Sequence, residues 1–304
     1  MRPPASRYLS HVDPSTSGDP VTPSRRETEL TTAARTWDDR ALQRALDAAG
    51  TEGWGPVAVL PSTGSTNADA AEQAREGCPE GFTVVADEQS AGRGRLDRAW
   101  ESPSGAGLAM SVVLRPTTPS TSWGWVPLLA GVAVVDALGR QGVAASLKWP
   151  NDVVVDGPAH DGGEGPRKLG GLLVERVAEA DALVVGIGIN TDLRSHELPV
   201  ARATSTWLEG ADVVREQLLV DVLEELRRRT TQWSAGSGDA RRTGLLDDYA
   251  RRCLTLGRSV RVHLPGGTDL RGVAQAVDDS GRLVVRTDDG RTQTVSAGDV
   301  EHVR

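Results

Sequence analysis

The pattern of hydrophobic and polar positions predicts helices and strands mixed along most of the chain. Apolar residues that recur every three or four positions indicate helices. Short continuous runs of apolar and β-branched residues are typical of strands. The predicted helices cover 37–49, 68–76, 126–139 and 213–233. The predicted strands cover 57–60, 82–86, 108–114, 145–149, 153–155, 168–175 and 182–190. Because the two kinds of element do not alternate regularly, we expect an α+β fold, with helices covering a mixed sheet.

After about residue 254 the pattern changes to short strands only. They are separated by turn residues such as Asp289-Gly290, a dipeptide typical of hairpins. The strands are expected at 259–264, 269–276, 283–287 and 291–295, which predicts a small separate β-barrel.

The N-terminal segment 1–35 is rich in Pro, Ser, Thr and charged residues and has few large apolar ones. Such a segment cannot bury enough surface to offset the entropy of ordering, so we expect a disordered tail. The predicted domains are therefore the tail at 1–35, a larger domain at 36–253 and the barrel at 254–304.

Bulk properties argue against several classes of protein. The net charge is −8, which opposes nucleic-acid binding through a broad basic surface. Two cysteines, Cys78 and Cys253, cannot form a disulfide framework, and the five scattered histidines do not have zinc-ligand spacing. No run approaches the ~20 apolar residues of a membrane span, and the N-terminus does not resemble a secretory signal. We therefore expect a cytoplasmic protein.

The most informative local motif is Gly92-Arg93-Gly94-Arg95-Leu96-Asp97-Arg98-Ala99-Trp100. Glycine allows the backbone to approach a ligand closely, and arginine carries a planar set of donors that matches carboxylate and phosphate oxygens. The motif therefore suggests a loop that folds over a small anionic ligand. In isolation, however, a solvated basic turn is the commoner explanation for such a short motif.

Four further segments place polar residues or glycines at or near the ends of predicted helices and strands. The segments are Ser65-Thr66-Asn67, Lys148-Trp149-Pro150-Asn151-Asp152, Lys168-Leu169-Gly170-Gly171 and Gly186-Ile187-Gly188-Ile189-Asn190. Each also has a purely structural explanation. In the same order, these explanations are a helix cap, a solvated strand end, a surface charge and a packing site.

Taken together and in this order, the five segments resemble the biotin protein ligases, over about residues 57–254 and on into the barrel. The resemblance implies a class II synthetase-like catalytic core over 36–253, followed by an SH3-like barrel. It implies a ligase that uses ATP and Mg²⁺ to convert biotin to biotinyl-5′-AMP. The biotinyl group then passes to a lysine of a biotin carboxyl carrier domain of an acyl-CoA carboxylase.

The resemblance also implies roles for individual residues. Lys168 and Arg95 are expected to be catalytic, since fixed cations offset the repulsion between a carboxylate and a phosphate. The implied biotin-binding residues are Ser65, Thr66, Asn67, Gln89, Arg93, Gly94, Arg95, Lys168, Gly171, Gly186 and Gly188. The implied ATP-binding residues are Arg95, Trp100, Asn151, Lys168 and Asn190.

Two features concern how this chain differs from the family that it resembles. Asp97 stands where the family usually has glycine, and we expect this anion among the arginines to weaken retention of the adenylate. The segment 1–56 has room for one clear helix and is not notably basic, so we expect no specific DNA binding and no repressor activity. Two rival functions remain, a lipoate or octanoyl transferase and a nucleotide-binding scaffold without catalysis.

Overall fold

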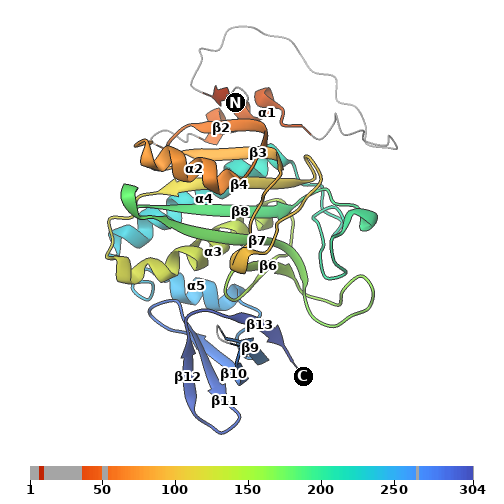
Figure 1. Ribbon diagram of the computed structural model, residues 1–304, viewed down its shortest axis with the longest axis vertical. Helices are drawn as coiled ribbons and strands as arrows, with labels where there is room; N and C mark the ends of the chain where they lie inside the picture. The colour runs from red at the N-terminus through yellow and green to blue at the C-terminus, as the bar shows by residue number, and fades with distance from the viewer. Residues whose placement is uncertain (1–6, 10–35, 50–53, 265–266, 304) are drawn as a thin grey trace.

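The computed structural model describes residues 7–9, 36–49, 54–264 and 267–303, and its strands form two sheets (Figure 1). The main sheet has eight strands in the order β1-β2-β3-β4-β8-β7-β6-β5. The C-terminal sheet has five, in the order β12-β11-β10-β9-β13. Among the described strands of the main sheet, β2 and β3 pair in parallel, and every other neighbouring pair is antiparallel. The main sheet is therefore mixed, as predicted.

The element bounds agree with most of the sequence predictions. The main-sheet strands are β1 Arg7–Leu9, β2 Val57–Thr63, β3 Thr83–Gln89, β4 Gly107–Leu114, β5 Ser146–Lys148, β6 Asp152–Val155, β7 Arg167–Val177 and β8 Ala182–Asn190. The C-terminal strands are β9 Ser259–His263, β10 Asp269–Val277, β11 Leu283–Thr287, β12 Thr292–Val295 and β13 Asp299–His302. The α-helices are α1 Asp39–Ala49, α2 Thr66–Arg75, α3 Val126–Arg140, α4 Arg215–Ala235 and α5 Leu245–Arg252.

Three short elements were not expected from the sequence. Helix α5 buries only Leu245 and Tyr249, and strand β13 buries only Val300, so neither carries enough apolar positions for its period to be recognised. Strand β1 lies inside the segment expected to be disordered and pairs antiparallel with β2. The rest of that predicted tail lies outside the described residues.

The two faces of the main sheet are covered differently. Consecutive strand residues alternate between two apolar clusters: Val85 packs in the cluster of α3 and α4, whereas Val84 packs with Ala70 and Ala74 of α2. Helices α3 and α4 lie together behind the sheet in Figure 1, and α2 lies in front of it near β3, β4 and β8. Among the described helices α2 reaches the front face of β7 through Asn67, and none covers the front face of β6.

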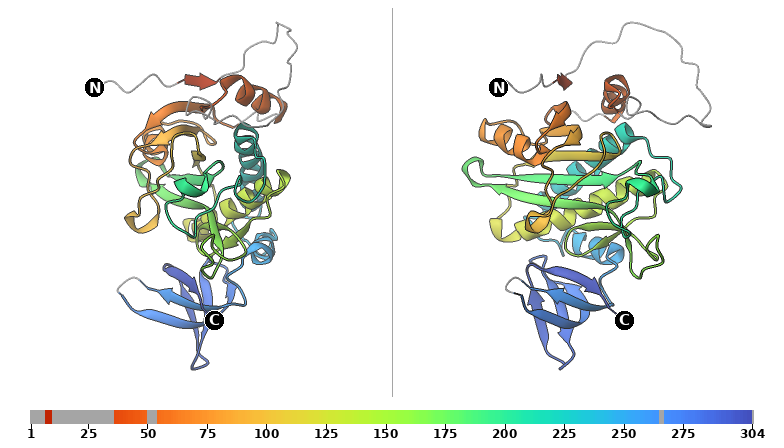
Figure 2. Two further views of the ribbon diagram at one scale, coloured as in Figure 1. Left: turned by 90° about the vertical axis from the view of Figure 1, so that its right-hand side faces the viewer. Right: turned by 45° about the vertical axis from the view of Figure 1, so that its right-hand side comes forward.

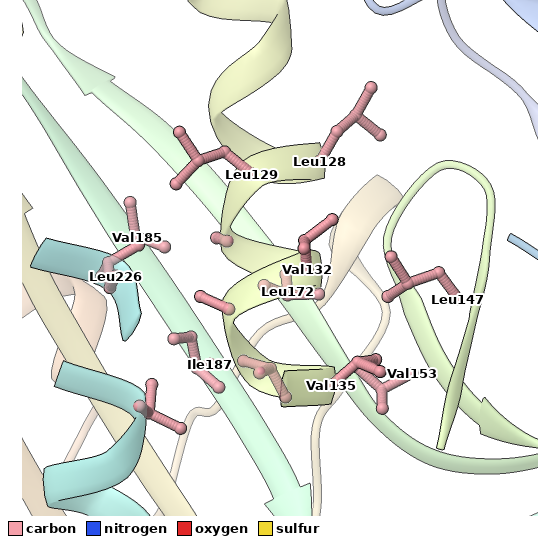
Figure 3. Packing of buried hydrophobic residues seen from close by; sticks show 14 of the residues in the cluster. Leu128, Leu129, Val132, Val135, Leu147, Val153, Leu172, Val185, Ile187 and Leu226 are labelled. Carbon is pink, nitrogen blue, oxygen red and sulfur yellow. The ribbon is translucent and has the colours of Figure 1, made fainter. Parts of the chain in front are cut away.

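Helix α3 forms the centre of the larger core. Figure 3 shows its Leu128, Leu129, Val132 and Val135 packed between β-strand residues such as Ile187 and the helix α4. The segment Ser120–Arg140 is long and apolar enough to cross a membrane by length and composition alone, but 67% of its most apolar stretch is buried inside the fold. Its apolar surface is thus used for packing against the sheet and α4.

The C-terminal sheet lies beyond α5 at one end of the molecule and is attached through tryptophans (Figures 1 and 2). The indole of Trp149 donates a hydrogen bond to the Gly281 carbonyl at 3.2 Å, and that of Trp125 donates to the Asp279 carbonyl at 2.9 Å. A Cβ at Gly124 would lie 2.4 Å from the Ser280 carbonyl oxygen. The turn between β10 and β11 is therefore seated closely on the larger domain, which fixes β13 next to the main sheet.

His302 lies at the same junction and makes it sensitive to acid. Its Nε2 is 3.2 Å from Thr255 Oγ1, and burial, reinforced by the charges of Lys148 and Arg258, lowers its pKa to about 4 from 6.5. Between these values the unfolded chain binds more protons than the folded one, so the neutral ring stabilises the fold above pH 6.5 and this contribution is lost as the pH falls toward 4. We expect the free energy of urea unfolding to fall over this window less steeply in His302→Gln than in the wild type. If the free energy of unfolding fell equally with pH in the two proteins, His302 would not be the group responsible.

Candidate active site

A cavity of about 420 Å³ lies on the front face of the main sheet, where α2 leaves it open. It is bounded by the start of α2, by strands β3 to β8, by the segment 92–100, which we call the lid loop, and by residues of the C-terminal sheet. Thirteen sequence-predicted residues line it: Ser65, Thr66, Asn67, Gln89, Arg93, Gly94, Arg95, Trp100, Asn151, Lys168, Gly171, Gly186 and Gly188.

One row of paired residues runs along the floor of this cavity. The registers place Gly188 of β8 beside Gly171 of β7; Ala109 of β4, on the other side of Gly188, does not line the cavity. The row continues through Asp152 on β6 to Lys148 at the end of β5. The floor therefore begins as nearly bare backbone, which allows a ligand to approach closely, and ends in two charged side chains.

The glycines of β8 are needed for close packing by the side chains above them. A Cβ at Gly186 would lie 2.1 Å from Asn67 Oδ1, and one at Gly188 would lie 2.6–2.9 Å from the Trp100 indole. At Gly171 a Cβ would make only ordinary contacts, 3.5 Å from Lys168 and 3.7 Å from Trp100. Bare positions on β8 thus allow Asn67 and Trp100 to reach the floor of the cavity.

The polar end of the cavity lies at the start of α2. Gln89 Oε1, at the end of β3, accepts from the Thr66 backbone N–H at 2.9 Å and from its hydroxyl at 3.0 Å. The buried Ser111 hydroxyl donates to Asn67 Oδ1 at 2.6 Å and lies 2.8 Å from Thr66 Oγ1. The Asn67 amide donates to Glu175 at 2.6 Å. This network fixes the orientation of each amide group, so polar atoms are positioned before a ligand arrives.

The lid loop is a tight hairpin. Arg93 and Ala99 form a β-bridge, the Gly94 N–H donates to the Arg98 carbonyl at 2.7 Å, and the Trp100 N–H donates to the Gly92 carbonyl at 2.9 Å. At its tip Leu96 has a left-handed backbone (φ 56°) and an exposed side chain. The Asp97 side chain is outside the described part of the structure, so the proposed effect of Asp97 stays a prediction.

The three arginines of the lid loop point to three different partners. Arg93 pairs with Glu175 of β7 at 3.4 Å, Arg95 donates to Asn151 Oδ1 at 3.2 Å, and Arg98 forms an ion pair with Asp299 of β13. Burial lowers the pKa of Arg95. The guanidinium stays charged nevertheless, because the ordinary pKa of arginine is far above neutral pH. The loop therefore connects the main sheet to the C-terminal sheet across the mouth of the cavity.

Lys148 and Lys168, the only two lysines of the chain, both line the cavity. Lys168 Nζ lies 2.6 Å from Asp152 Oδ1 and 5.9 Å from the centre of the Trp100 ring. Lys148 Nζ lies 3.9 Å from the other oxygen of Asp152, and burial lowers its pKa. One carboxylate thus stands between two ammonium groups, and the site retains excess positive charge for an anion.

One predicted residue lies elsewhere. Asn190 does not line this cavity; it is buried at the end of β8, where its amide donates to the Thr204 carbonyl at 3.0 Å. The sequence analysis missed Ser111, Glu175 and Asp299 as parts of the site. Ser111 gave a usable signal, since it is a single polar residue in an apolar strand, whereas Asp299 belongs to a strand that was not predicted.

The described residues contain no group of three or more His, Cys, Asp or Glu side chains arranged to hold a metal ion. At nucleotide sites Mg²⁺ keeps several waters and is bound mainly by substrate phosphates with one or two carboxylates. Asp152 and Asp299 both line the cavity and are the carboxylates suited to this role.

Comparisons with known proteins show which family the chain resembles. Residues 59–192 match the biotin/lipoate A/B protein ligase family, and residues 255–303 match the biotin protein ligase C terminal domain. A biotin–[acetyl-CoA-carboxylase] ligase of Mycobacterium tuberculosis is 38% identical, over 88% of this chain and 96% of its own. The bifunctional ligase/repressor BirA of Bacillus spizizenii is 34% identical, over 78% and 71%.

A solved structure has a similar fold. It is a biotin protein ligase from Aquifex aeolicus in complex with biotin and ATP, with a TM-score of 0.66 and 29% identity, covering 82% of this chain and 98% of that one. The sequence relatives and this structure extend over both sheets of the chain. The chain therefore belongs to the biotin protein ligase family.

Proposed function

We propose that this protein is an ATP-dependent biotin protein ligase, which forms biotinyl-5′-AMP and transfers the biotinyl group to a lysine of a biotin carboxyl carrier domain. The observation that carries the proposal is the arrangement of Lys168 and Arg95 over a cavity floor of bare backbone. Two cations at such a floor suit a reaction that joins two anions, because they offset the repulsion between carboxylate and phosphate. The names of the M. tuberculosis relative and the A. aeolicus complex support the same activity.

Biotin occupies the end of the cavity near α2 in this proposal. Its fused ring system packs against the side chains of Asn67 and Trp100, which Gly186 and Gly188 allow to reach the floor of the cavity. Its polar ring atoms need fixed donors and acceptors, and the network of Thr66, Asn67 and Gln89 supplies them. Its carboxylate then reaches Lys168 on β7, which lies between the α2 end and the strands β6 and β5.

In the first step, a biotin carboxylate oxygen bonds to the α-phosphorus of ATP and pyrophosphate leaves. Lys168 and Arg95 stabilise the charge on the carboxylate and the α-phosphate, while Trp100 and Asn151 are placed to contact the nucleotide. Mg²⁺ supplies further charge neutralisation at the phosphates, with Asp152 and Asp299 as its candidate carboxylates.

In the second step, the amine of the carrier lysine attacks the acyl carbon, an amide forms and AMP leaves. The acyl-adenylate is a mixed anhydride that water hydrolyses, so it must be covered until the carrier arrives. The lid loop covers the cavity and is held by Arg93, Arg95 and Arg98. No side chain of this chain needs to act as a covalent nucleophile.

The remaining assignments belong to the same proposal. The catalytic domain covers about 36–253, and the C-terminal sheet, from about 254, completes the nucleotide end of the site through Asp299 and Val300. A cytoplasmic location and the absence of specific DNA binding or membrane attachment also remain proposals. The acceptor is the carrier domain of an acyl-CoA carboxylase, as the name of the M. tuberculosis relative suggests.

The decisive experiment supplies the purified protein with ATP, Mg²⁺ and a carrier domain, together with either biotin or lipoate. We expect ATP-dependent incorporation of biotin at the carrier lysine and AMP as a product. Incorporation of lipoate in preference to biotin would instead support the rival transferase, and formation of neither conjugate would support the non-catalytic scaffold. A carrier domain with its acceptor lysine changed to arginine is the matched control.

A further inference from the structure

We propose that Glu175 is a positioning residue for biotin, whose charge decides how the Asn67 amide is presented to the ligand. The inference rests on the proposed function, in which biotin occupies the end of the cavity near α2. Glu175 itself does not line that cavity. It lines a neighbouring hollow of about 340 Å³ together with Arg93 to Leu96 of the lid loop, so it acts through the residues that it holds.

The strand β7 places Glu175 beside the biotin end of the cavity. Residues of a strand alternate between its two faces, so Gly171, Leu173 and Glu175 follow one another on the same face. Gly171 and Leu173 line the cavity, and the Asn67 amide also donates to the Leu173 carbonyl at 3.3 Å. Glu175 is therefore the residue on this face of β7 that follows the last one lining the cavity.

The two oxygens of the Glu175 carboxylate have different partners. Oε2 accepts from the Asn67 amide at 2.6 Å, and Oε1 pairs with Arg93 at 3.4 Å. The Arg93 side chain is 48% exposed, so the ion pair contributes little energy, whereas Asn67 is buried and its bond to the charged oxygen is the stronger one. Arg93 thus holds one oxygen toward the lid loop and leaves the other for Asn67.

A carboxylate only accepts hydrogen bonds, and this fixes the amide of Asn67. Its NH₂ group must face Glu175, so its oxygen faces the buried Ser111 hydroxyl, which donates to it at 2.6 Å. The single proton of Ser111 is then used, and the Thr66 hydroxyl is left to donate to Gln89 Oε1 at 3.0 Å. The negative charge therefore sets the direction of the hydrogen bonds along the biotin end of the cavity.

The substitution Glu175→Gln removes this restraint and keeps the shape of the side chain. An amide donates as well as accepts, so it can pair with either end of the Asn67 amide. The Asn67 amide is then free to turn over, and the polar ring atoms of biotin no longer meet donor and acceptor in one fixed order. Glu175→Asp keeps the charge on a shorter side chain, so we expect it to restore part of the binding.

The test separates biotin binding from the rest of the reaction. Wild type, Glu175→Gln and Glu175→Asp are compared with Glu179→Gln, an exposed control just beyond β7. The measurements are calorimetric titration with biotin, the KM for ATP, kcat at saturating biotin and thermal unfolding. We expect Glu175→Gln to raise the biotin Kd about 10- to 100-fold, the strength of a hydrogen bond to a charged group, and to leave kcat and the KM for ATP within about 2-fold of wild type. The Kd of Glu175→Asp should lie between the two, and the control should match wild type.

A double-mutant cycle with Asn67→Ala separates a positioning role from a structural one. If Glu175 acts through Asn67, Glu175→Gln costs little further biotin affinity once the amide is absent. Additive losses in this cycle, or a biotin Kd for Glu175→Gln within about 2-fold of wild type, overturn the proposal. If Glu175→Gln does not fold, Ser111→Ala decides, because it frees the other end of the Asn67 amide, and wild-type biotin affinity in that variant overturns the proposal as well. A wild type that does not bind biotin would instead overturn the proposed function itself, so the two failures are distinguishable.

Discussion

Replacing Lys168 by methionine is expected to reduce the rate of biotinyl-5′-AMP formation about 10²- to 10³-fold, the usual cost of removing one preorganised donor from a developing anion. Methionine keeps the length of the side chain and removes its charge. The Lys168 side chain is 41% exposed, and Asp152 keeps Lys148 nearby, so we expect the fold to be retained. The measurement is single-turnover formation of the adenylate, with thermal unfolding as the check on folding.

Variants of Lys168 test both half-reactions. Lys168 touches the acyl-phosphate in our proposal, so Lys168→Met is expected to slow both adenylation and transfer from supplied biotinyl-5′-AMP. Lys168→Arg is a useful second variant, because a planar guanidinium keeps the charge but cannot reproduce a compact ammonium. An adenylation rate for Lys168→Met within about 3-fold of wild type would refute the catalytic assignment.

Substitution of Gly188 by alanine is expected to give the second large effect. The new methyl group would lie 2.6–2.9 Å from the indole of Trp100, so the ring must move from the position in which, in our proposal, it contacts the nucleotide beside the biotin site. Overpacking typically costs 1–3 kcal/mol, and we expect the kcat/KM for biotin and for ATP to fall on the order of 10-fold or more. Steady-state kinetics and the change in Trp fluorescence on ligand binding would measure it.

The matched control for this variant is Gly139→Ala. Gly139 lies in α3, and a Cβ there would meet nothing within 4 Å, so alanine is expected to leave the kinetics unchanged and to stabilise the helix slightly. Equal kinetics for Gly188→Ala and wild type would mean that the Trp100 position is not needed for either substrate.

The sequence predicted the elements with strong apolar periodicity and the motifs at their ends. Helices α3 and α4 and strands β4 and β8 carry enough buried residues for their periods to be recognised. The motifs led to thirteen residues that the fold brings to one cavity, because they lie on or beside neighbouring strands, at the start of α2 or in the loop above them.

The rest of the site depends on information that a local pattern does not contain. Asp299 reaches the lid loop only because the β10–β11 turn is seated against Trp125 and Trp149, a contact between residues more than 100 positions apart. Asn190 follows Gly186 and Gly188 in the same alternation, yet it lies past the cavity and bonds to the Thr204 segment. The motif correctly predicted that Asn190 shares a strand with the two glycines. It did not show where along that strand the ligand site ends.

The placement of the two lysines limits how biotinyl-5′-AMP, which the protein itself forms, can modify the protein. Biotinyl-5′-AMP acylates any accessible amine, and a ligase that releases some of it is exposed to the highest local concentration. Every basic residue of this chain other than Lys148, Lys168 and the five histidines is an arginine, which does not form such an amide. Apart from the N-terminal amine, the two lysines of the cavity are thus the amines that escaped adenylate could modify. Beyond the N-terminus, amine-directed labels should report on the occupied or empty state of the cavity.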